Sequence, residues 1–98
     1  MIKKWTNDEL IAAVDAYVSI FEASNRGETV IKSDKIGALL SGRLSARTKG
    51  SIEYRFANIS AVLEIAGKPW LEGYVPARNV GPTNEKKIRA MLMERGVI

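Results

Sequence analysis

The residues best suited to chemistry lie between positions 43 and 63, where basic and amide side chains accompany an apolar helical repeat. Apolar residues recur at positions 52, 56, 59 and 63, which share one face of a helix. Arg55 and Asn58 fall on the other face. Arginine binds phosphate or guanine, and asparagine can pair with adenine through two hydrogen bonds. This pattern favours a helix that reads DNA with its polar face. An ordinary amphipathic helix with a solvated polar face is the alternative interpretation.

Basic side chains before and at the start of this helix are candidates for phosphate contacts, which hold a DNA-binding protein in register without reading sequence. They are Lys32, Lys35, Arg43, Arg47 and Lys49. Ser51 and the N–H groups at the helix start could hold a further phosphate. Two alternatives remain open at single positions. Asn58 can instead be a buried amide that ties down the following loop, and Glu53 can neutralise Arg47 or Arg43.

Composition narrows the class of protein. The 98 residues are expected to form one domain, residues 1–98. The chain has no cysteine and no histidine, so it lacks thiolate chemistry, the commonest general base and the commonest metal ligand. We expect no cofactor, no metal and no catalytic activity. No apolar run approaches a membrane span, and the first residues lack the apolar core of a signal peptide, so a cytoplasmic location is expected.

The net charge of +4 is distributed unevenly. Residues 31–60 hold six basic and two acidic residues, whereas residues 1–30 hold three basic and five acidic residues. A localised basic segment on a small domain favours a polyanionic partner.

The elements that position these residues are predicted to be four helices. Thr6 and Glu9 form a capping-box pattern, and Trp5 and Leu10 a hydrophobic staple, so the first helix begins after Thr6 and ends near residues 23–25. A second, short helix starts near residue 33, with Ser33 or Asp34 as N-cap.

The third helix is capped between residues 48 and 51 and runs to Ala66, because Gly67 followed by Lys68-Pro69 stops it. Residues 67–82 are rich in glycine and proline and are expected to form an ordered loop, with Trp70, Leu71, Tyr74 and Val75 packed on the helices. Thr83 would cap a last helix. The predicted fold is an all-α, four-helix domain in which the second and third helices form a helix-turn-helix.

Two stretches resemble known families. Lys4-Trp5-Thr6, with Glu9 and Leu10, resembles the first helix of Myb/SANT-type tri-helical domains, and residues 44–55 resemble the entry to their recognition helix. Only Trp5 occupies a position of the regularly spaced Myb tryptophans.

Residues 47–81 resemble a small helical domain at the N-terminus of HNH-type and related restriction endonucleases of bacteria and phages. The motif is carried by Arg47, Ser51-Ile52-Glu53, Arg55, Asn58-Ile59-Ser60, Gly73-Tyr74, Pro76 and Asn79-Val80-Gly81. The resemblance implies an accessory domain that binds or positions double-stranded DNA, plain or modified. It implies no catalysis in this chain, because the nuclease signature needs histidine. Either a nuclease part belongs to a separate segment of a parent protein, or the chain is a stand-alone DNA-binding protein.

A protein-interaction or oligomerisation module is the alternative function. SANT-like domains often bind proteins, and the Trp70–Val75 loop and Met93 could supply an apolar surface. This interpretation predicts an exposed apolar patch, where DNA binding predicts a basic one.

Overall fold

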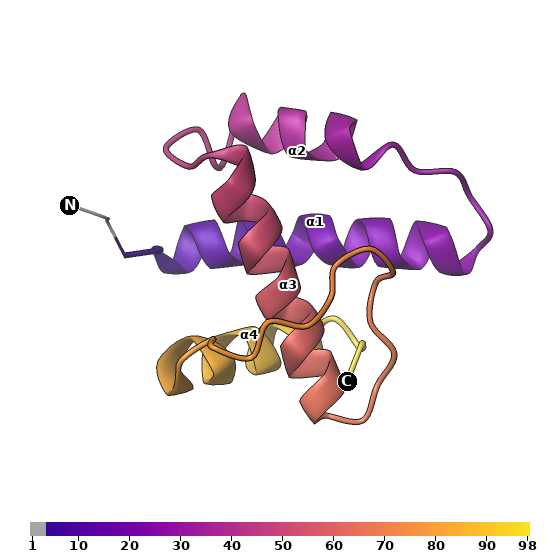
Figure 1. Ribbon diagram of the computed structural model, residues 1–98, viewed down its shortest axis with the longest axis vertical. Helices are drawn as coiled ribbons and strands as arrows, with labels where there is room; N and C mark the ends of the chain where they lie inside the picture. Colours follow the sequence, from indigo (N-terminus) through magenta and orange to yellow (C-terminus); the bar gives the residue numbers. More distant parts are fainter. Residues whose placement is uncertain (1–3) are drawn as a thin grey trace.

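Helix α3 (Lys49–Ile65) is the central element of the fold. The computed structural model describes residues 4–98, which contain four α-helices and no strand. The others are α1 (Asn7–Asn25), α2 (Lys32–Leu40) and α4 (Pro82–Glu94). In Figure 1, α3 begins beside the end of α2 and crosses α1 steeply on its way past α4, and it contacts all three helices. The all-α, four-helix prediction is confirmed. None of the helices in residues 4–98 combines the length and the apolar character that a membrane span requires.

Capping boxes start both long helices. At α1, the Thr6 hydroxyl accepts a hydrogen bond from the Glu9 N–H at 3.1 Å, and the Glu9 carboxylate accepts one from the Thr6 N–H at 2.9 Å. Thr48 and Ser51 make the same reciprocal pair at the start of α3, at 3.1 Å in each direction. These bonds satisfy N–H groups that lack a partner inside the helix, so both predicted starts are confirmed.

The other two helix starts differ from the prediction. Helix α2 has Ile31 as its N-cap rather than Ser33 or Asp34, and Lys32 already lies within the helix. Helix α4 begins at Pro82 with Gly81 as N-cap, so the predicted cap at Thr83 is wrong. Proline suits the first helical position, because its φ angle is preset and its missing N–H would have no helical partner there.

Aromatic residues connect the helices to the loop between α3 and α4. Phe56 on α3 meets the rings of Tyr17 and Tyr74 edge to face, with centroids 5.7 and 5.2 Å apart. The Tyr17 hydroxyl bonds to the Ser60 hydroxyl and accepts from the Leu71 N–H, both at 2.8 Å. Burial raises the pKa of that hydroxyl. The loop is therefore attached to α1 and α3 through the core.

Only some of the apolar residues of the loop pack on the helices. Leu71 and Tyr74 are buried as predicted, whereas Trp70 is exposed and Val75 is 79% exposed. The Leu71 and Ala77 N–H groups anchor the backbone on either side of this stretch. Figure 1 shows the loop crossing in front of α3 on its way to α4.

Candidate nucleic-acid interface

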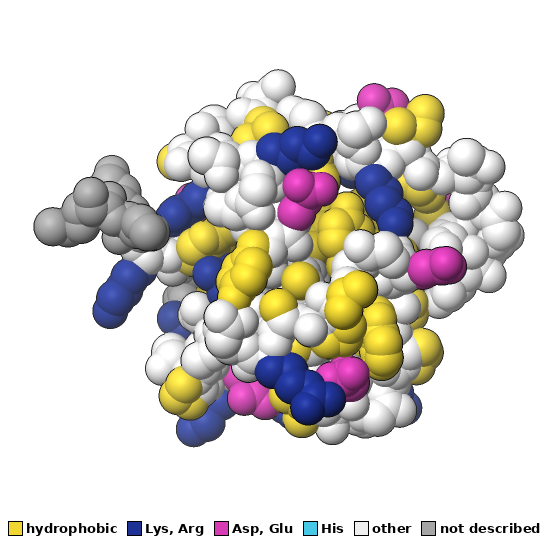
Figure 2. All heavy atoms as spheres, viewed as in Figure 1, with side chains coloured by type: hydrophobic (Ala, Val, Ile, Leu, Met, Phe, Trp, Pro, Cys, Tyr) yellow, Lys and Arg dark blue, Asp and Glu magenta, His cyan; other side chains and the backbone are white. Residues whose placement is uncertain are grey.

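Three of the predicted phosphate contacts lie at the surface of the α2–turn–α3 unit. Lys35, Arg43 and Lys49 are all exposed. Arg43 reaches Asp15 on α1 at 3.3 Å, but both side chains remain about half exposed, and such pairs contribute little to stability. On the face seen in Figure 2, Lys and Arg side chains are scattered among apolar and acidic ones. The basic residues of this face therefore form separate points of charge rather than one continuous patch.

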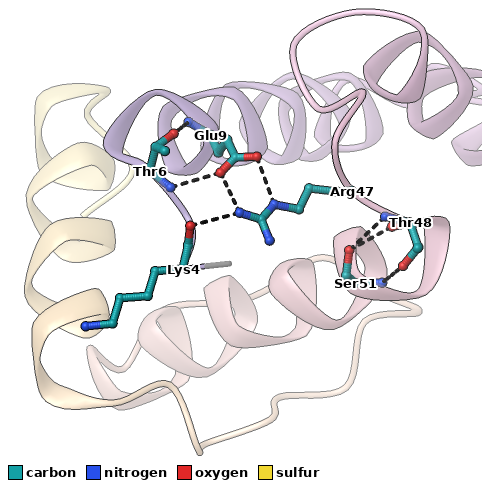
Figure 3. Close-up of polar contacts among 6 residues, drawn as sticks. All are labelled: Lys4, Thr6, Glu9, Arg47, Thr48 and Ser51. Atoms are coloured by element: carbon teal, nitrogen blue, oxygen red, sulfur yellow. Dashed lines mark hydrogen bonds and ion pairs between the residues drawn. The ribbon is translucent and has the colours of Figure 1, made fainter. Parts of the chain in front are cut away.

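Arg47 is not one of these surface charges. Its guanidinium makes two hydrogen bonds to the Glu9 carboxylate, at 2.7 and 2.8 Å, and one to the Lys4 carbonyl at 2.9 Å (Figure 3). It also lies over the Trp5 ring, 5.0 Å from the ring centroid. Only 9% of the Arg47 side chain is exposed. The predicted phosphate contact is wrong here, because the guanidinium is already held by a carboxylate.

The Arg47–Glu9 pair ties the turn before α3 to the start of α1. Hydrogen bonding from Arg47, partly opposed by burial, lowers the pKa of Glu9 to about 2. The same hydrogen bond raises the pKa of Arg47. The pair thus fixes the turn between α2 and α3 on the rest of the fold, and Glu9 takes the role considered for Glu53.

Asn58 lies in the interior, with 1% of its surface exposed. Its amide donates to the Ala77 carbonyl at 2.8 Å, and its carbonyl accepts from Arg55 at 3.2 Å. The Ala77 N–H in turn donates to the Ala57 carbonyl at 3.1 Å. The alternative interpretation is confirmed: Asn58 ties down the loop. Its assignment to base edges is wrong, because the loop covers the face of α3 on which it lies.

Arg55 is also drawn inward. Its guanidinium stacks over the Trp5 ring, 4.7 Å from the centroid, and bonds to Asn58. Burial, followed by the nearby charge of Arg47, lowers the pKa of Arg55. Its Nε is buried and has no hydrogen-bond partner among the described residues. Arg55 therefore packs against Trp5 and does not project from α3 towards DNA bases as predicted.

Lys32 and Ser51 already have partners in the fold. The Lys32 ammonium donates to the Glu72 carbonyl at 2.6 Å and lies 5.0 Å from the centre of the Tyr74 ring. The Ser51 hydroxyl completes the capping box and donates to the Thr48 carbonyl at 2.9 Å. These contacts hold the loop and the start of α3, and the phosphate roles predicted for the two residues stay predictions.

The surface of α3 that remains open includes Lys49, which the sequence singled out, and Gly50 and Tyr54, which it did not. Lys49, Gly50 and Tyr54 are exposed along its first two turns, and Glu53 is partly exposed. Their spacing by three or four residues is a detectable signal for a shared face. The stacking of Arg47 and Arg55 on Trp5 had no comparable signal. Among residues 4–98, no group of three or more acidic, cysteine or histidine side chains is placed to hold a metal ion.

Several residues of the motif that resembles the restriction-endonuclease domain make contacts that hold this fold together. Arg47 clamps the turn to α1, Ser51 caps α3 and Asn58 anchors the loop. The resemblance itself remains a prediction. Comparisons of the chain with protein-family models, with curated proteins and with solved structures find no match.

Proposed function

We propose that the chain is a non-catalytic module that binds double-stranded DNA, plain or modified, through its α2–turn–α3 unit. The observation that carries the proposal is the open face of the first two turns of α3, where Lys49, Gly50 and Tyr54 are exposed directly after the turn at residues 41–48. In helix-turn-helix proteins the N-terminal residues of the second helix contact base edges. The loop is bonded to α3 at Ala57 and Asn58 and covers that face, so the contact proposed here is made by the first two turns.

The phosphate contacts in this proposal are Lys35, Arg43 and Lys49, the predicted residues that remain exposed. Glu53 and Tyr54 replace Arg55 and Asn58 as the residues nearest the base edges. A carboxylate can accept from the cytosine amino group, and a tyrosine hydroxyl can donate or accept. The resemblance to restriction-endonuclease domains supports a role as an accessory of a nuclease carried elsewhere in a parent protein.

The test is binding of the whole chain to a labelled duplex across a salt series. We expect the logarithm of affinity to fall linearly with the logarithm of salt concentration, by about 0.9 for each phosphate contact. Lys49→Gln should lower the affinity and reduce this slope by about one contact. Lys68→Gln is the matched control, because Lys68 is an exposed lysine just beyond the opposite end of α3. Absence of binding to every duplex at low salt, or equal effects of both variants, would refute the proposal.

A protein-binding module is the second candidate. Large apolar side chains are exposed on the loop and on α4, namely those of Trp70, Val75 and Met93. Figure 2 shows hydrophobic side chains gathered across the middle of the face on which α3 and the loop lie. If DNA binding fails, sedimentation of the wild type and of Val75→Ser over a concentration series would test self-association. Association that is lost in Val75→Ser would favour this second function.

A further inference from the structure

An open pocket of about 570 Å³ lies between the start of α1, the middle of α3 and the start of α4. Its size falls in the ordinary range for small-molecule sites. Its lining combines cationic side chains, one aromatic ring and the first turn of α4. The lining residues are Lys4, Trp5, Arg55, Val80, Gly81, Pro82, Thr83, Asn84 and Lys87.

The charges around this pocket are unbalanced. Lys4, Arg55 and Lys87 line it, and no carboxylate is among the described lining residues. Arg55 differs from the other arginines of the chain, each of which has a carboxylate oxygen within 4 Å. Those paired arginines are Arg26, Arg43, Arg47, Arg78, Arg89 and Arg95. The described partner of the Arg55 guanidinium is the neutral Asn58 carbonyl, and its buried Nε has none. Arg55 is thus a partly buried cation that still lacks an anion.

The three cations are held by contacts that leave donors available. Arg55 is fixed by stacking on Trp5. Lys87 is held by one hydrogen bond to the Asn7 side chain at 2.8 Å, and an ammonium has three donors. The backbone at Lys4 is held through its carbonyl by Arg47, while its side chain extends away from that contact (Figure 3). The charges are therefore positioned at the pocket without being neutralised.

The start of α4 adds donors to the same pocket. Its N-cap, Gly81, supplies no side chain, and the first hydrogen bond of the helix runs from the Glu85 N–H to the Gly81 carbonyl at 2.9 Å. The Thr83 and Asn84 N–H groups precede that bond and have no side-chain cap. Glu85, the acidic residue of this turn, pairs with Arg89 at 3.6 Å. The partial positive charge of the helix start thus reinforces the three cations.

We propose that this pocket binds the phosphate group of a phosphate monoester, such as a nucleotide or the 5′ end of a nucleic acid. A monoester carries a charge of about −1.5 to −2 at neutral pH, against −1 for a phosphodiester, so three cations favour the monoester. Its oxygens can accept from the Arg55 and Lys87 side chains and from the Thr83 and Asn84 N–H groups. The inference does not rest on duplex binding by α3, because the two surfaces share none of the residues assigned to them.

The test is a titration of the ¹⁵N-labelled whole chain with inorganic phosphate, a nucleoside 5′-monophosphate and the matching nucleoside, followed by amide NMR shifts. We expect the Thr83 and Asn84 amide signals to move with both phosphate probes and to stay in place with the nucleoside. Lys87→Gln should weaken the affinity about tenfold, the size of one lost charged hydrogen bond. Lys86→Gln is the control, because Lys86 neighbours it on α4, is exposed and lies outside the pocket. Its affinity should stay within about twofold of wild type.

Two results would overturn the inference: no shift at Thr83 and Asn84 with millimolar phosphate, or equal weakening by the two lysine variants. Lys4→Gln provides a second pocket variant on a different segment and should weaken binding as Lys87→Gln does.

Oligonucleotides with and without a 5′ phosphate distinguish the two sources of the phosphate group, a nucleotide and the end of a nucleic acid. Tighter binding of the phosphorylated strand than of the mononucleotide supports the inference with a nucleic-acid end as ligand, and equal binding supports it with a nucleotide. Lys49→Gln should leave the affinities for inorganic phosphate and the nucleoside 5′-monophosphate unchanged while it weakens duplex binding, so failure of duplex binding and failure of the pocket are separable.

Discussion

Replacing Glu9 by glutamine should destabilise the fold by about 3 kcal/mol at neutral pH. The pKa of the Glu9 carboxyl falls from its ordinary 4.5 to about 2 in the folded chain, chiefly because Arg47 donates to it. Each pKa unit of that difference corresponds to about 1.4 kcal/mol of folding free energy. Glutamine can still accept from the Thr6 N–H, so the variant keeps the capping box and removes the charge. It leaves Arg47, with 9% of its side chain exposed, without its carboxylate.

The assay is urea denaturation of wild type and Glu9→Gln at a series of pH values from 7 downwards. Because the folded-state pKa is depressed, the stabilisation is complete above about pH 4.5 and is lost as the pH falls towards 2. The difference in free energy of unfolding between the two proteins should therefore shrink over this interval. Asp8→Asn is the control, since Asp8 is an exposed carboxylate in the same turn, and its cost should stay below about 1 kcal/mol. A difference that is independent of pH, or a Glu9→Gln cost no larger than that of Asp8→Asn, would refute the reasoning.

Three further predictions concern the loop, the interior of α2 and the end of α3. Asn58→Ala should lower the free energy of unfolding by about 1–3 kcal/mol, since it leaves the Ala77 carbonyl without its donor, and should speed amide hydrogen exchange across residues 68–81. Unchanged stability and exchange would contradict the anchoring role. Gly37→Ala should raise stability by about 0.5–1 kcal/mol, because Gly37 is helical with open space around its Cβ position. Gly67→Ala should lower stability by about 1 kcal/mol, because its φ is +73°. Thermal denaturation would check both, and effects of the same sign would contradict the assignment.

The helices were predictable because the signals that start and stop them are local. Thr6 with Glu9, and Thr48 with Ser51, are partners three residues apart, so each capping box can be read from a short stretch of chain. The predicted N-cap of α4 was wrong because two local signals competed there. Thr83 is a good cap, but Pro82 before it fits the first helical position better.

The candidate site was less predictable because its residues have distant partners. Arg47 bonds to Glu9, which is 38 residues away, and Asn58 bonds to Ala77, which is 19 residues away. Helical periodicity correctly placed Asn58 opposite the main apolar stripe of α3. It could not show that the loop after α3 returns to cover that second face.

By itself, the sequence determined the helical class, the capping box of Thr6 and Glu9, the cap of α3 between residues 48 and 51, its stop before Gly67 and the presence of many basic residues without histidine or cysteine. The tertiary structure decided which of those charges remain available. It paired Arg47 with a carboxylate and buried Asn58, and it brought Lys4, Arg55 and Lys87 to one pocket. The physical reason is that capping and amphipathic patterns act within a few residues, whereas burial and ion pairing depend on segments that meet only when the chain folds.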